Sequence, residues 1–84
     1  MRVNNLPPLR MRQKQVGAII DELGGTSHVA KMLGVQPSAV SNWRRDGRLP
    51  ARTYLPLIDR LKGSDIVLFG YLWGMADITV GRDL

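Results

Sequence analysis

A glycine between two short amphipathic segments is the feature that most restricts how this chain can fold. Gly34 follows an apolar-patterned stretch that ends at Leu33, and Pro37 opens the next stretch. A glycine adopts the left-handed conformation that ends a helix at low steric cost, and proline suits a first helical turn because its missing N–H would have no partner there. We therefore expect two short helices joined by a tight turn, at about residues 27–33 and 37–45.

The second of these helices has an apolar side and a polar side. Val40 and Trp43 lie three positions apart and therefore face the same way. With Ala30 and Gly34 they are expected to form one inward-facing set, in which the small Ala30 lets the helices cross closely. The residues left on the outer side are all polar: Ser38, Ser41, Asn42, Arg44 and Arg45.

This pattern resembles the Cro/repressor (lambda-repressor-like) helix-turn-helix of phage and bacterial transcription regulators. That family has a small residue early in its second helix and a glycine four positions later. A branched apolar residue follows after six more positions, and a bulky apolar residue three after that. Here these residues are Ala30, Gly34, Val40 and Trp43. The phrase GVQPSAVSNWRRDGRLP is also typical of the family's turn, recognition helix and following loop. The resemblance covers about residues 10–62 and implies a mainly α, compact domain of four to five helices.

The rest of the chain fits three parts: an irregular arm (1–9), a helix-turn-helix domain (10–63) and a C-terminal core or dimerisation segment (64–84). The first helix is expected at about residues 10–23, where apolar residues recur at helical spacing. Thr26 or Ser27 would cap the second helix. A fourth helix is expected from about Pro50 to Gly63, starting nearer Thr53 if Pro56 is to fall in its first turn.

The last part of the chain has two readings. A fifth helix is favoured slightly over two short strands at residues 66–69 and 78–80, although two glycines weigh against a helix. Either form leaves a dense apolar cluster, which would complete the core, form a dimer interface, or do both. An interface is considered because aromatic residues and Met are enriched there. Its members are Phe69, Tyr71, Leu72, Trp73 and Met75.

Positive charge accompanies the helix-turn-helix. Residues 1–63 contain 11 Lys/Arg and 4 Asp/Glu, a net +7, whereas residues 64–84 contain 1 Arg and 3 Asp, a net −2. The sum is the +5 of the whole 84-residue chain. This distribution is expected if the motif meets phosphates.

The resemblance implies which side chains would contact DNA. Base contacts fall on Gln36, Ser38, Ser41, Asn42 and Arg45. Pro37 departs from the many relatives with a polar residue there. Candidate phosphate contacts are Ser27, His28, Lys31, Arg44, Arg48 and Arg52. Alternatives remain open: Ser38 as a helix cap, Asn42 as a solvated residue, and Arg44 or Arg45 as surface charge or as a partner of the helix C-terminal dipole. Arg2 on the arm would either enter a minor groove or remain solvated.

Other chemistries find little support in the sequence. The chain has no cysteine, one histidine and no phosphate-binding or nucleophile–base motif, so we expect no enzyme, metal site or cofactor. Its longest apolar run, IVLFGYLWGMA, has 11 residues and is too short to span a bilayer. A cytoplasmic location is expected.

The sequence therefore predicts a sequence-specific regulator that binds double-stranded DNA. The simplest version is a Cro-like repressor acting as a homodimer on an inverted-repeat operator. Two alternatives remain: an antitoxin-like regulator whose apolar tail binds a partner protein, and a protein-interaction module that kept the fold without binding DNA.

Overall fold

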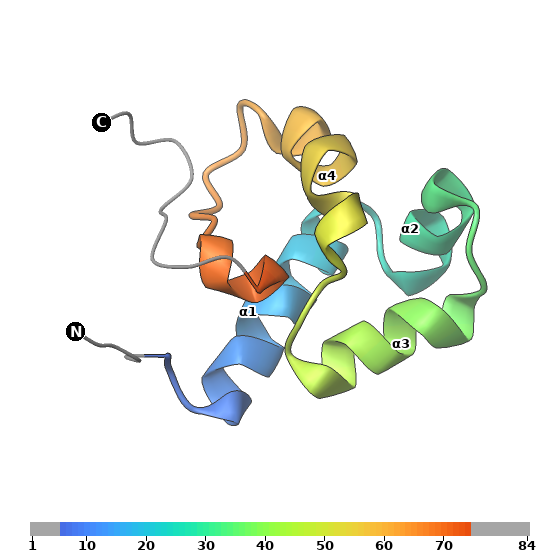
Figure 1. Cartoon of the computed structure of the whole chain (residues 1–84). Coiled ribbons are helices and arrows are strands. Elements are labelled where there is room, and N and C mark those ends of the chain that lie inside the picture. The colour runs from blue at the N-terminus through green and yellow to red at the C-terminus, as the bar shows by residue number, and fades with distance from the viewer. Residues whose placement is uncertain (1–5, 75–84) are drawn as a thin grey trace.

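Apolar residues at helical spacing form the first and longest helix where the sequence predicts it. In the computed structural model, which describes residues 6–74, α1 spans Leu9–Glu22 and buries Val16, Ile19 and Ile20 (Figure 1). Residues 6–8 precede it without regular structure, and Leu9, the last residue of the expected arm, is already the first residue of α1. Residues 1–5, which include Arg2, lie outside the described part of the chain.

The remaining elements are short and helical. They are α2 (Thr26–Leu33), α3 (Pro37–Asp46), the 3₁₀ helix η1 (Ala51–Thr53), α4 (Tyr54–Leu61) and the 3₁₀ helix η2 (Gly70–Trp73). The described residues include no strand, which confirms the mainly α fold class. No helix within residues 6–74 combines the length and the apolar character needed to cross a membrane.

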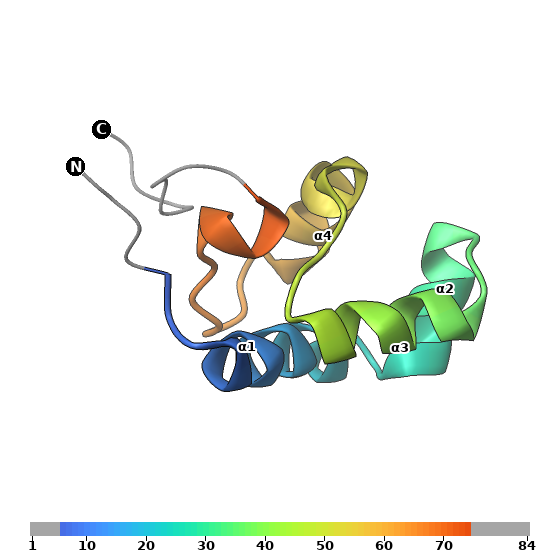
Figure 2. The same cartoon turned by 60° about the horizontal axis from the view of Figure 1, so that its bottom comes forward.

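The helices form two layers around one core. In Figure 2, α1 and α3 form the lower layer, and α2 lies at one end of α3. The upper layer consists of α4 and η2. Every element except η1 contributes apolar side chains to the space between the layers. The buried set is Val16, Ile19, Ile20, Val29, Ala30, Val40, Trp43, Leu49, Leu57, Leu61, Leu68, Leu72 and Trp73.

The turn between α2 and α3 has the conformation expected from its glycine. Gly34 is left-handed, with φ 71° and ψ 33°, and the Val35 N–H donates to the Ala30 carbonyl at 3.0 Å. Two details of the expectation are wrong. Gly34 itself is exposed rather than inward-facing, because its role is in the backbone. The N-cap of α2 is Gly25, and no side chain of Thr26 or Ser27 caps the helix.

The fourth helix accommodates its proline in the first turn. Pro56 is the third residue of α4, where a backbone N–H has no intrahelical partner. The 3₁₀ turn η1 precedes it, and the Thr53 hydroxyl donates to the Pro50 carbonyl at 2.7 Å. The expected later start near Thr53 is therefore confirmed.

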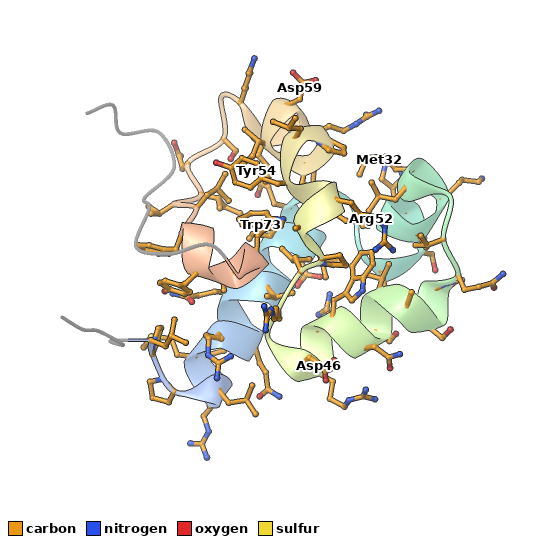
Figure 3. All side chains as sticks on the ribbon, viewed as in Figure 1. Met32, Asp46, Arg52, Tyr54, Asp59 and Trp73 are labelled. Atoms are coloured by element: carbon orange, nitrogen blue, oxygen red, sulfur yellow. The ribbon has the colours of Figure 1, made fainter. Side chains whose placement is uncertain are left out.

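The C-terminal segment differs from both expectations. Instead of a fifth α-helix or a strand, residues 66–74 form an irregular stretch followed by the single turn η2. The second expected strand, at residues 78–80, lies outside the described residues. Tertiary contacts hold this turn: the Leu49 N–H donates to the Leu72 carbonyl at 2.7 Å, and Trp73 Nε1–H donates to Thr53 Oγ1 at 3.0 Å. The Trp73 ring also packs edge-on against Tyr54, as Figure 3 shows.

A second left-handed glycine ends α3 where α3 meets α1. Gly47 has φ 64° and ψ 34°, nearly the same backbone conformation as Gly34. The surroundings differ, because a Cβ at Gly47 would lie 3.0 Å from Arg12 Cβ and 3.1 Å from the Gln13 backbone nitrogen. A Cβ at Gly34 would meet nothing within 4 Å. Gly47 therefore combines a backbone requirement with a steric one.

These two glycines provide a matched test of the α1–α3 contact. We expect Gly34→Ala to lower the free energy of unfolding by about 1 kcal/mol, the cost of left-handed backbone in a residue with a Cβ. Gly47→Ala should cost about 1–3 kcal/mol more, because its Cβ overpacks the junction. Urea unfolding followed by circular dichroism measures both. Equal losses in the two variants would contradict the close approach.

Candidate nucleic-acid interface

One side of α3 is polar and uncovered along its whole length. Ser38, Ser41, Asn42 and Arg45 follow one another at positions i, i+3, i+4 and i+7 and are all exposed. The opposite side holds Val40, which is fully buried, and Trp43, which is 8% exposed. We call the four exposed residues the α3 outer face.

The start of α3 extends this face. Gln36 is the N-cap residue in extended conformation, Pro37 follows at the first helical position, and both are exposed. Gln36 makes no side-chain capping hydrogen bond to α3, and Ser38 does not cap the helix either. Four of the five predicted base-contact residues therefore lie on the α3 outer face, and Gln36 is exposed at the start of the same helix.

The packing of α2 fixes the N-terminal half of α3. Ala30, 2% exposed, lies in the core cluster with Val40 and Trp43. Its small side chain fits the close helix crossing that the sequence predicts. The motif core of Ala30, Val40 and Trp43 is confirmed, with Gly34 serving the turn instead.

The C-terminal end of α3 is fixed by α1. The Gln13 side-chain amide donates a hydrogen bond to the Arg45 carbonyl, one of the free carbonyls of the last turn. Next to it, Gly47 lies against Arg12 and Gln13. The α3 outer face is therefore presented by a helix held at both ends.

Arg44 does not lie with the other predicted phosphate contacts. Its Nη1 is 3.0 Å from Asp21 Oδ1, and its side chain is 35% exposed, against 68% for Arg45. The guanidinium lies over Gly17 on α1. The Arg44 charge is paired with Asp21 within the protein, so a phosphate would have to compete with that carboxylate.

Arg45 remains available on the outer face. Its Nε lies 3.4 Å from Asp46 Oδ1, and both side chains are more than half exposed. An exposed ion pair of this kind contributes little and is readily exchanged for another partner. Figure 3 shows Asp46 at the C-terminal end of α3.

Apart from His28, the other predicted phosphate contacts fall into two groups. Ser27 and Lys31 are exposed on α2, and Arg52 is exposed on η1, extending in Figure 3 towards the side where α2 and α3 lie. Arg48 is exposed, but its guanidinium lies against Gly74 of the C-terminal segment. The first group fits a phosphate role best.

His28 lies in a different part of the surface. Its ring packs against Gly24, and it lines a hollow of about 530 Å³ with residues from the end of α1 and from α4. The lining includes the negative Glu22 and Asp59 and the positive Arg60, so His28 faces side chains of mixed charge. Its contact with a phosphate stays a prediction. No group of metal ligands occurs among residues 6–74.

Of the residues predicted to form a dimer interface, two are buried inside the single chain and two are partly exposed. Leu72 is fully buried and Trp73 is 2% exposed, so both belong to the core of the single chain and their assignment to an interface is wrong. Phe69 and Tyr71 are half-buried and stack with ring centroids 5.2 Å apart. The Tyr71 hydroxyl donates to Gln15 Oε1 at 3.0 Å. Met75 lies outside the described residues.

The α1 residues that contact α3 were not predicted from the sequence. Gln13, Gly17 and Asp21 occur four residues apart, which places them along one side of α1. These three residues form neither an apolar face, which would predict a core contact, nor a run of charges, which would predict a solvated surface. Their spacing of four residues is the only feature of the sequence that could have indicated a contact with another helix.

Comparison of this chain with protein-family models, with curated proteins and with solved structures gives no significant match.

The α3 outer face should be dispensable for folding. Ser41→Ala and Asn42→Ala remove exposed side chains for which residues 6–74 provide no hydrogen-bond partner, so each should change the free energy of unfolding by less than about 0.5 kcal/mol. Val40→Ala on the opposite side should cost about 2 kcal/mol, because it leaves a cavity in the core. Thermal unfolding of the three variants compares them. A large loss for Asn42→Ala would mean that the outer face has a structural role.

Proposed function

We propose that this protein is a sequence-specific regulator that binds double-stranded DNA through the α3 outer face. The observation that carries the proposal is the division of α3 into a buried apolar side and an unbroken exposed polar side. A helix anchored at both ends, with its polar side uncovered, matches the way a recognition helix enters a major groove.

The side chains of this face suit the reading of base edges. Ser41 and Asn42 are short, so the helix can approach the groove floor closely, and an asparagine amide can bond adenine at two positions. Arg45 offers two parallel N–H donors, which fit either guanine or a phosphate. Pro37 has no polar side-chain group, so at its own position it can make only apolar contact.

Cations at the edges of this face would hold the DNA backbone. Lys31 on α2 and Arg52 on η1 come from the elements before and after α3, and both are exposed. As exposed cations on the elements next to α3 in the chain, these two residues are assigned to phosphates that flank the groove. The excess positive charge of residues 1–63 supports the same orientation.

The proposal includes a homodimer that blocks or recruits polymerase by occupying a promoter. Two domains related by a two-fold axis would read half-sites about 34 Å apart, one turn of DNA. The stacked pair of Phe69 and Tyr71, together with Val67 at 63% exposed, supports a contact surface on the C-terminal segment. The same surface would serve an antitoxin-like regulator, in which a different protein covers it.

Selection of binding sites from a random duplex library tests the central proposal. We expect an inverted-repeat motif to be enriched. Asn42→Ala should weaken binding to the selected site about 5- to 100-fold and relax the preference at one base position per half-site. The control Asp59→Asn changes an exposed residue of α4 remote from α3 and should preserve the preference. Failure of the wild-type protein to bind any duplex at low salt would favour the protein-interaction module instead.

A pair of matched aspartate variants tests the dimer surface. Phe69→Asp places a charge in the stacked pair, whereas Leu55→Asp places one at another exposed apolar position, 73% exposed on α4. We expect Phe69→Asp to shift the protein to monomer in sedimentation equilibrium and to lower operator affinity, while Leu55→Asp leaves both unchanged. The reverse result would move the interface to α4, and a monomeric wild-type protein would exclude a preformed homodimer.

A further inference from the structure

Arg44 lies in a site on α1 that fits its guanidinium. Gly17 is buried beneath it, and a Cβ at Gly17 would lie 3.6 Å from Arg44 Nη2. That distance is an ordinary van der Waals contact, so the guanidinium leaves room at this position for a methyl group but not for a large side chain. Asp21, one turn further along α1, supplies the carboxylate at 3.0 Å.

This site belongs to a row of contacts that follows α1. Gln13 bonds the Arg45 carbonyl, Gly17 lies under the Arg44 guanidinium, and Asp21 pairs with it. The three contacts reach two neighbouring residues of α3: Arg45 through its backbone carbonyl and Arg44 through its side chain. Burial of Val40 and Trp43 sets the rotation of α3 to within a few degrees. The Arg44 side chain leaves the helix about 100° away from Arg45, so its contact with α1 acts from a different direction and refines that rotation.

Rotation of α3 decides where its outer face points. Side-chain tips lie about 5–6 Å from the axis of a helix, so a rotation of about 10° displaces them by about 1 Å. Hydrogen bonds to bases tolerate only about 0.5 Å, the spread of normal donor–acceptor distances. A small rotation would therefore misalign Ser38, Asn42 and Arg45 together.

We propose that Arg44 is a positioning residue for DNA recognition: with Gly17 and Asp21 it refines the rotation of α3, and it does not neutralise a phosphate. This inference rests on the proposed function. The contact combines the ion pair with packing of the guanidinium against Gly17, and to change recognition about tenfold it must favour the native rotation of α3 by the same factor. The two adjacent arginines then have separate tasks, Arg44 towards α1 and Arg45 towards DNA.

The salt dependence of binding separates the two roles. Each phosphate contact contributes about 0.9 to the slope of log K against log salt concentration, whereas a positioning residue contributes nothing to it. We would measure affinity for the selected operator and for a scrambled duplex across a salt series. The variants are Arg44→Ala, Asp21→Asn, their combination, and Arg45→Ala as the matched control.

We expect Arg44→Ala and Asp21→Asn each to lower the ratio of operator to scrambled affinity by about tenfold, within the range of one base contact, with the salt slope unchanged. The double variant should be no worse than the more affected single variant, because both act through one contact. Arg45→Ala should reduce the slope by about 0.9 if it bonds a phosphate, or lower the affinity for the operator alone if it bonds a base.

A second route displaces the guanidinium without changing any charge. Gly17→Leu would occupy the surface on which Arg44 rests, whereas Gly17→Ala leaves an ordinary van der Waals contact at 3.6 Å. We expect the leucine variant to lose discrimination about tenfold at constant slope, and the alanine variant to retain it.

Two results would overturn the inference. A slope reduced by about 0.9 in Arg44→Ala, with Asp21→Asn binding as well as or better than wild type, would make Arg44 a phosphate contact. Unchanged discrimination in Arg44→Ala, Asp21→Asn and Gly17→Leu would mean that the contact does not position α3. If the wild-type protein binds neither duplex, the proposed function fails first, and the positioning role fails with it.

Discussion

The close approach of α3 to α1 at Gly47 is the contact on which the rest of the structure depends. Gly47 is buried and left-handed, and no Cβ would fit there without moving Arg12 or Gln13. Because the two helices touch at this point, the Gln13 amide can reach the end of α3 and Arg44 can reach Asp21. The orientation of the α3 outer face follows from this junction together with the packing of α2.

The C-terminal segment completes the domain instead of forming a separate unit. A domain of this size buries too little surface to leave a large apolar cluster outside its core. Leu72 and Trp73 fill the space above α1, and the hydrogen bond from Trp73 to Thr53 satisfies both buried polar groups. Phe69 and Tyr71 remain at the surface, where they are available to a second chain.

Local periodicity predicted the four α-helices and the turn at Gly34, but not the form of the C-terminal segment. The helix boundaries, the left-handed Gly34 and the burial of Val40 and Trp43 follow from spacing that is visible along the chain. It could not predict contacts between distant segments. Arg44 and Arg45 are neighbours of equal charge, and only the position of Asp21, 23 residues from Arg44, separates their environments. The single 3₁₀ turn at Gly70–Trp73 likewise depends on contacts with Leu49 and Thr53 rather than on local preference.

A titration of the isotopically labelled protein with its selected operator duplex, followed by amide NMR, tests the account most directly. We expect the largest changes at the exposed residues from Gln36 to Arg45, with smaller ones at Lys31 and Arg52, and little change around Asp59. Changes confined to the surface of Phe69 and Tyr71, or no change at any duplex concentration, would contradict recognition of DNA by α3.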